Sequence, residues 1–104
     1  MVNEYFYRVA KVGQTVKFPC PTKLEEDVDW KQPVPSGSYI YLGNVGYHDL
    51  GKQPKFAVLD RNQLYSLVIY NVTVDDTGTY QCIEEGGHGN SRHYLLTVMG
   101  DLNY

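Results

Sequence analysis

The stretch Asp76-Thr77-Gly78-Thr79-Tyr80-Gln81-Cys82 decides the fold of this chain. It ends in one of only two cysteines, and the other, Cys20, is followed ten residues later by Trp30. An even pair of cysteines in a small chain favours a disulfide and an oxidising compartment. Two free, buried thiols in a reducing compartment are the alternative that the cysteine count leaves open.

On both sides of this stretch, short segments with alternating polarity are separated by turn residues, and no helical periodicity is present. Val16, Phe18 and Cys20 alternate with polar neighbours, so they are expected to share one face of a strand. Leu67 and Ile69 are expected to lie on the core side of a later strand. The pattern predicts an all-β fold with a packed core.

Prolines and glycines mark the places where strands are expected to end. Pro33 and Pro35 should end the strand that carries Trp30, because proline removes a hydrogen-bond donor from the ladder. Residues 86–90, Gly-Gly-His-Gly-Asn, contain no aliphatic side chain and are typical of a hairpin loop between the last two strands.

Length and composition favour one domain over residues 1–104, because the chain is too short for two. Hydrophobic residues make up 42% of the chain and charged residues 20%, which is sufficient for a packed core. The net charge is −3 and there is no basic block, so neither nucleic acid nor an anionic membrane surface is expected as a partner.

The sequence has no segment of about 18 apolar residues that could span a bilayer. The N-terminus lacks the basic and apolar regions of a signal peptide, and Met1 is interpreted as an addition for expression. Any membrane anchor is therefore expected outside residues 1–104.

Taken together, Cys20, Trp30 and the 76–82 stretch resemble the immunoglobulin superfamily over most of the chain. The resemblance implies a two-sheet sandwich with Greek-key connections and a Cys20–Cys82 disulfide between the sheets, against which Trp30 packs. It also implies that the Tyr80 hydroxyl bonds back to the upstream chain, in the arrangement called the tyrosine corner. Another Greek-key sandwich with an unrelated disulfide is the alternative.

Two further implications of the resemblance concern the ends of strands. Asp76 matches the carboxylate that family members pair with a basic residue, and Lys55 lies at the matching position. The 37 positions from Trp30 to Leu67 leave room for the extra strands C′ and C″ of a V-type domain, which constant-type domains lack. An intermediate-set domain with a long C–D loop is the alternative.

The chain departs from the variable domains of antigen receptors at two places. Those domains carry Phe-Gly-x-Gly before the last strand, whereas residues 90–93 are Asn-Ser-Arg-His. Lys31-Gln32-Pro33 also replaces the usual segment that supports pairing of two variable domains. The resemblance is therefore closer to V domains of adhesion, costimulatory or innate immune receptors.

Such receptors usually bind partners through the outward face of strands G, F, C and C′. An apolar patch with a polar surround is expected there, which suits protein recognition, although the same residues are also compatible with an ordinary sheet surface. The predicted partner-binding residues are Lys31, Tyr39, Tyr41, Gln81, Ile83, His93 and Leu95. Alternatively, the acidic loop segments 23–27 and 84–92 carry the binding.

Catalysis and metal binding are not expected. The histidines His48, His88 and His93, with Glu84 and Glu85, lack metal-ligand spacing. The chain has no nucleophile motif, phosphate loop or plausible triad, so no enzyme activity and no cofactor are predicted.

Asn71-Val72-Thr73 is an N-glycosylation sequon. If Val72 points inward where the strand ends, Asn71 points outward and can be modified. An unused tripeptide is the alternative.

The leading functional hypothesis is the extracellular, ligand-recognition domain of a cell-surface receptor that binds another protein or a second copy of itself. The alternatives are a secreted innate immune protein that recognises microbial surfaces through its loops, and a structural spacer domain.

Overall fold

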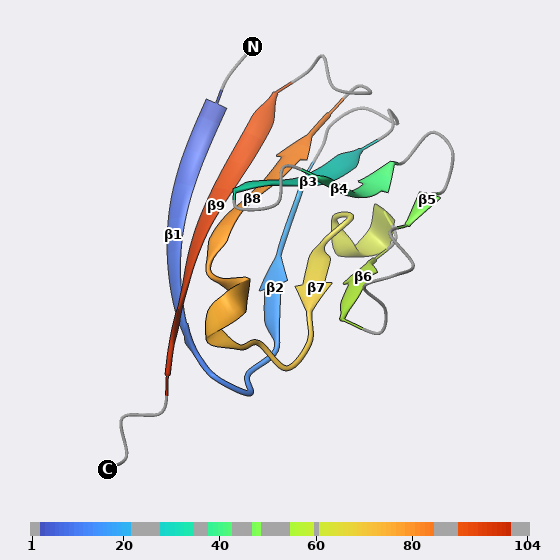
Figure 1. Ribbon diagram of the computed structural model, residues 1–104. Helices are drawn as coiled ribbons and strands as arrows, with labels where there is room; N and C mark the ends of the chain where they lie inside the picture. Colours follow the sequence, from blue (N-terminus) through green and yellow to red (C-terminus); the bar gives the residue numbers. More distant parts are fainter. Residues whose placement is uncertain are drawn as a thin grey trace.

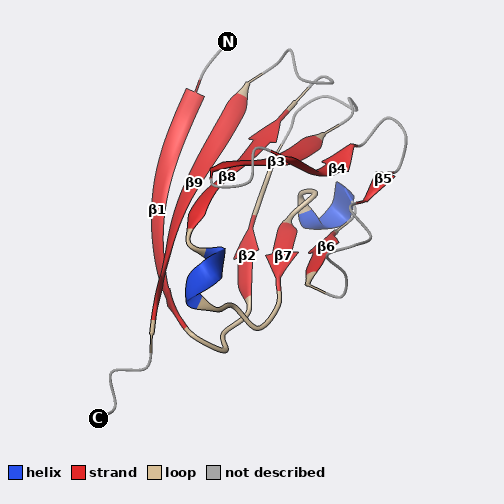
Figure 2. Cartoon of the chain, in the orientation of Figure 1, coloured by secondary structure: helices blue, strands red, loops and turns tan. Residues whose placement is uncertain are grey.

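The computed structural model describes residues 3–21, 28–34, 38–42, 47–48, 55–59, 61–84 and 90–100. The side chains of residues 33–34, 38–39, 41–42, 47–48 and 61 are outside this description. The described residues form strands and two short 3₁₀ turns, with no α-helix among them (Figures 1 and 2). The elements are β1 (Asn3–Lys11), β2 (Val16–Phe18), β3 (Asp29–Val34), β4 (Ser38–Leu42), β5 (Tyr47–His48), β6 (Phe56–Val58), η3 (Arg61–Gln63), β7 (Leu67–Ile69), η4 (Val74–Asp76), β8 (Gly78–Ile83) and β9 (Ser91–Met99).

The strands form two sheets that face each other. One sheet has the order β1-β9-β8-β3-β4-β5, and the other has the order β2-β7-β6. β1 pairs with β9 in parallel, and the remaining neighbours pair in antiparallel. Three strands, β4, β5 and β6, lie between Trp30 and Leu67 along the chain. The V-type prediction is thereby confirmed.

The core lies between the sheets, where alternate residues of each strand point inward. Val16 and Phe18 of β2, Leu67 and Ile69 of β7, and Trp30 of β3 are all buried. Their burial removes apolar surface from water, which is the main favourable contribution to folding. The predicted all-β sandwich is therefore confirmed.

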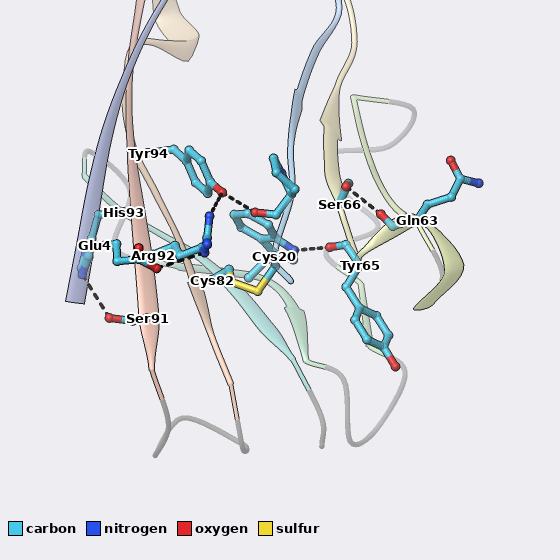
Figure 3. The surroundings of a disulfide bond; sticks show 12 residues. Glu4, Cys20, Gln63, Tyr65, Ser66, Cys82, Ser91, Arg92, His93 and Tyr94 are labelled. Atoms are coloured by element: carbon cyan, nitrogen blue, oxygen red, sulfur yellow. Dashed lines mark hydrogen bonds and ion pairs between the residues drawn. A yellow bond between two sulfur atoms is a disulfide. The ribbon is translucent and has the colours of Figure 1, made fainter. Parts of the chain in front are cut away.

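A disulfide joins the two sheets through this core. Cys20 lies two residues after the end of β2, and Cys82 lies in β8. Their Cα atoms are 6.0 Å apart. Both cysteines are buried, and Figure 3 shows their sulfur atoms in the middle of the sandwich. The alternative of free thiols is excluded in this structure.

The prediction that Pro33 ends its strand is wrong. β3 continues through Pro33 to Val34, but its register with β8 shifts between Lys31 and Val34. Because the ladder is irregular there, the missing N–H of proline is tolerated. Pro35 lies outside the described residues.

The candidate recognition surface

The lower end of the sandwich is fixed by an ion pair and a tyrosine. Lys55 Nζ lies 2.6 Å from Asp76 Oδ2 and donates a hydrogen bond to the Asn71 carbonyl at 2.9 Å. The Tyr80 hydroxyl donates to the Asp76 carbonyl at 2.6 Å, which is the geometry of a tyrosine corner. Burial, and secondarily the charge of Asp76, raise the pKa of Tyr80, so this hydroxyl stays protonated as a donor.

Trp30 is held by a turn of the opposite sheet that sequence reasoning did not find. Its Nε1 donates to the Tyr65 carbonyl at 2.8 Å (Figure 3). The backbone N–H of Cys20 donates to the Leu64 carbonyl at 2.9 Å. Leu64 and Tyr65 both have positive φ angles, of 58° and 46°. This left-handed turn directs two carbonyl groups toward the disulfide and the indole, although its residue types do not favour the conformation.

Tyr94 of β9 forms a second link between the sheets, also unforeseen. Its hydroxyl donates to the Pro19 carbonyl (Figure 3). Its ring stacks on Phe18 at 4.5 Å between centroids. Phe6 of β1 also stacks on the Tyr94 ring, at 5.3 Å between centroids. Burial raises the pKa of Tyr94. In the sequence, the only indication of this role was the alternation along the last strand, which places Tyr94 on its inward side.

The outward side of the six-stranded sheet, here called the outer face, brings most of the predicted partner-binding residues together. Lys31 of β3 lies opposite Gln81 of β8, and Gln81 lies opposite His93 of β9. Tyr5 of β1 continues the row beyond His93. The outer face is defined by Tyr5, Tyr7, Lys31, Gln81, Ile83, His93 and Leu95.

The apolar part of the outer face differs from the expectation. Ile83 and Leu95 are partly buried rather than fully exposed. The larger exposed apolar side chains belong to β1, where Tyr5 is 59% exposed, Tyr7 80% and Val9 65%. Tyr7 lies opposite Leu95 in the sheet. Because β1 lies beside β9, the exposed apolar surface lies nearer the edge of the sheet than expected.

His93 has a ring stack and two close polar neighbours on the outer face. Tyr5 stacks on its ring at 4.5 Å between centroids. Its Nε2 lies 3.3 Å from Ser91 Oγ and 3.5 Å from Gln81 Nε2, and Ser91 Oγ donates to Asn3 Oδ1 at 2.7 Å. Partial burial lowers the pKa of His93, which favours the neutral ring at pH 7.

Several predicted positions cannot be placed. The side chains of Tyr39, Tyr41 and His48 lie outside the described residues. The same holds for all of the predicted loop segment 23–27 and for residues 85–89 of the segment 84–92, which include Glu85 and His88. Ile40, between the two tyrosines, is buried. Among the residues that are described, no three His, Cys, Asp or Glu side chains gather as metal ligands. The same part of the chain contains no helix long and apolar enough for a bilayer.

A two-sheet sandwich with an inter-sheet disulfide, a buried tryptophan and a tyrosine corner defines an immunoglobulin-type recognition domain. The family model for the immunoglobulin V-set domain matches residues 7–99. The chain therefore belongs to the V-set family, whose members are binding and recognition domains.

Two relatives share the name cytotoxic and regulatory T-cell molecule. The human protein is 32% identical over 89 residues and the mouse protein 28% over 88 residues, in each case covering 84% of this chain. The chain spans only 22% of the length of either relative.

Solved structures share the fold at low sequence identity. One chain of the complex of Dpr1 IG1 with DIP-eta IG1 has a TM-score of 0.74 and 22% identity, and the match covers 90% of this chain and 89% of that one. The first immunoglobulin domain of the mouse polymeric immunoglobulin receptor has a TM-score of 0.70, 21% identity, and coverage of 94% and 93%. The ZIG-8 IG1 homodimer has a TM-score of 0.70, 19% identity, and coverage of 96% and 82%.

Proposed function

We propose that this chain is the ligand-recognition ectodomain of a cell-surface immune or adhesion receptor, and that it binds a protein partner through the outer face. In this proposal residues 1–104 act as one extracellular domain without catalytic activity, and any membrane anchor lies elsewhere in the parent protein. The disulfide and the similarity to the cytotoxic and regulatory T-cell molecules support the extracellular location.

The observation that carries the proposal is the row Lys31–Gln81–His93–Tyr5 across four strands. It places charged, polar and aromatic groups on one rigid sheet, with the partly buried apolar side chains of Ile83 and Leu95 beside them. Protein interfaces commonly combine apolar and aromatic anchors with a polar surround. Tyrosine adds large contact area at low entropic cost.

The structural neighbours support a protein as the partner. Dpr1 IG1 is bound to another immunoglobulin domain, and ZIG-8 IG1 forms a homodimer. A partner of the same domain type, including a second copy, is therefore the first class to test.

Replacing Ile83 by arginine is expected to weaken partner binding by about tenfold or more, because a charge would interrupt the apolar part of the outer face. The measurement uses the multimerised domain as a probe on cells that each display one extracellular protein, followed by affinity measurement for the partner found. Leu95→Arg should behave in the same way.

Val74→Arg is the matched control. Val74 is 52% exposed at the start of η4, so the same apolar-to-arginine change occurs away from the outer face. Its binding should equal that of the unmodified domain, and circular dichroism should show all variants folded. Normal binding by both Ile83→Arg and Leu95→Arg would contradict the assignment of the outer face.

We also propose that Asn71 carries an N-linked glycan. Asn71 is exposed and Val72 is fully buried, which leaves the sequon asparagine accessible after β7. β7 belongs to the three-stranded sheet, so a glycan here would leave the outer face open. Domain secreted from eukaryotic cells is expected to show glycan mass on the peptide containing Asn71, absent in Asn71→Gln. An unmodified peptide would contradict this proposal.

A further inference from the structure

β1 presents a long, unpaired strand edge. It pairs with β9 over all nine residues from Asn3 to Lys11 without a register shift, and no described residue pairs with its other side. Figure 1 shows β1 at the margin of the sheet with β9 as its neighbour. Natural proteins commonly protect such edges by short length, proline, a bulge or charged side chains, and β1 has only the last of these, at Glu4, Arg8 and Lys11.

The side chains of β1 make this edge self-complementary. In an antiparallel pair of two β1 strands centred on Phe6, Glu4 of one copy lies opposite Arg8 of the other, and the reverse pair follows by symmetry. Tyr5 of one copy then lies opposite Tyr7 of the other, and Phe6 opposite Phe6. Opposite charges and aromatic pairs at directly opposed positions both stabilise antiparallel strands.

The exposure of these residues leaves them available for such a contact. Tyr5 and Tyr7 are exposed on the outer face, and Glu4, Phe6 and Arg8 are exposed on the other side of the strand. Arg8 has no ion pair among the described residues, whereas Glu4 Oε1 lies 3.4 Å from Arg92 Nε in a partly exposed contact (Figure 3). A pairing centred on Tyr7 would instead place Glu4 opposite Ala10 and lose both ion pairs.

We propose that β1 is a self-association edge, at which two copies of this chain join their six-stranded sheets by antiparallel β1–β1 pairing centred on Phe6. The two-fold symmetry closes the assembly at a dimer, because each copy uses its single β1 edge. The interface is a narrow strip of backbone hydrogen bonds and side-chain pairs, so the dimer is expected to be weak and concentration-dependent.

The β1 edge shares Tyr5 and Tyr7 with the outer face, but its ion pairs are made by Glu4 and Arg8, which lie outside that face. Glu4 and Arg8 lie on the side of β1 that faces away from the outer face, as their alternation with Tyr5 and Tyr7 requires. Substitutions at Glu4 or Arg8 are therefore expected to leave partner binding unchanged. Conversely, Ile83→Arg should dimerise like the unmodified domain.

Sedimentation velocity over a concentration series tests the proposal by a charge exchange. Glu4→Arg places two arginines opposite each other at each end of the pair, and Arg8→Glu places two glutamates there, so each variant alone should self-associate about tenfold or more weakly. An equimolar mixture of the two variants restores opposite charges at both ends. The mixture should therefore form a heterodimer that neither variant forms alone.

Thermal unfolding checks that each variant keeps its fold, since Glu4→Arg also removes the contact with Arg92. Three results would overturn the proposal: an unmodified domain that is monomeric at every concentration, a mixture that stays monomeric while the unmodified domain dimerises, or dimerisation lost in Ile83→Arg but retained in both edge variants.

Discussion

Replacing Cys20 and Cys82 together by alanine is expected to lower the free energy of unfolding by about 4 kcal/mol. The disulfide closes a loop with a sequence separation of 62, which restricts the unfolded chain more than the folded one. A typical domain is stable by only about 5–15 kcal/mol, so this loss would leave a substantial unfolded fraction on mild heating. Urea denaturation followed by far-ultraviolet circular dichroism measures the loss.

The unmodified domain under reducing conditions is the matched comparison, because it keeps both buried sulfur atoms but loses the cross-link. Its stability should fall nearly as far as that of the alanine variant. The dependence of the unfolding free energy on urea should also steepen in both cases, because an uncrosslinked unfolded chain exposes more surface. An equal free energy of unfolding with and without the disulfide would contradict its role as the stabilising cross-link between the sheets.

Trp30→Ala is expected to cost about 3–5 kcal/mol of unfolding free energy, because it removes the largest fully buried side chain and leaves a cavity. The Tyr65 carbonyl would also lose the hydrogen bond from the indole. Since Trp30 is the only tryptophan, this variant has no tryptophan fluorescence, and circular dichroism is used to follow the unfolding.

Trp30→Phe separates the two contributions. It keeps an aromatic ring in the core but removes the N–H donor, so a smaller loss of about 1–3 kcal/mol is expected. If Trp30→Ala were no more damaging than Trp30→Phe, packing around the disulfide would not depend on the bulk of the indole.

The sequence was informative where residue spacing has one structural meaning. The 76–82 stretch, Cys20 and Trp30 together define the sandwich, and the distance from Trp30 to Leu67 leaves room for β4, β5 and β6. These features were predictable because a disulfide and its packing partners impose fixed positions on central strands.

The pairing of β1 with β9 was not predictable in the same way. Residues 3–11 and 91–99 lie at opposite ends of the chain, and parallel pairing leaves no hairpin signal between them. Alternation tells which side chains share a face, but it does not identify the neighbouring strand. For this reason the exposed Tyr5, Tyr7 and Val9 were missed, and Ile83 and Leu95 were expected to be more exposed than they are.

The positive φ angles at Leu64 and Tyr65 and the continuation of β3 through Pro33 also depend on contacts with distant parts of the chain. Neither leucine nor tyrosine favours a positive φ angle, so the turn is stabilised by the hydrogen bonds that its carbonyls accept from Cys20 and Trp30. Pro33 was predicted to end its strand because proline lacks a backbone N–H donor. The hydrogen-bond ladder around Pro33 is irregular, so the missing donor is tolerated and the strand continues.

Hydrogen–deuterium exchange on the domain bound to its protein partner tests the use of the outer face most directly. We predict that binding slows exchange in β3, β8 and β9, where Lys31, Gln81, Ile83, His93 and Leu95 lie, and leaves β2 and β7 of the other sheet unchanged. Protection confined to the loop segment 23–27 and to residues 84–90, the part of the predicted loop segment 84–92 that precedes β9, with no change in those three strands, would contradict it.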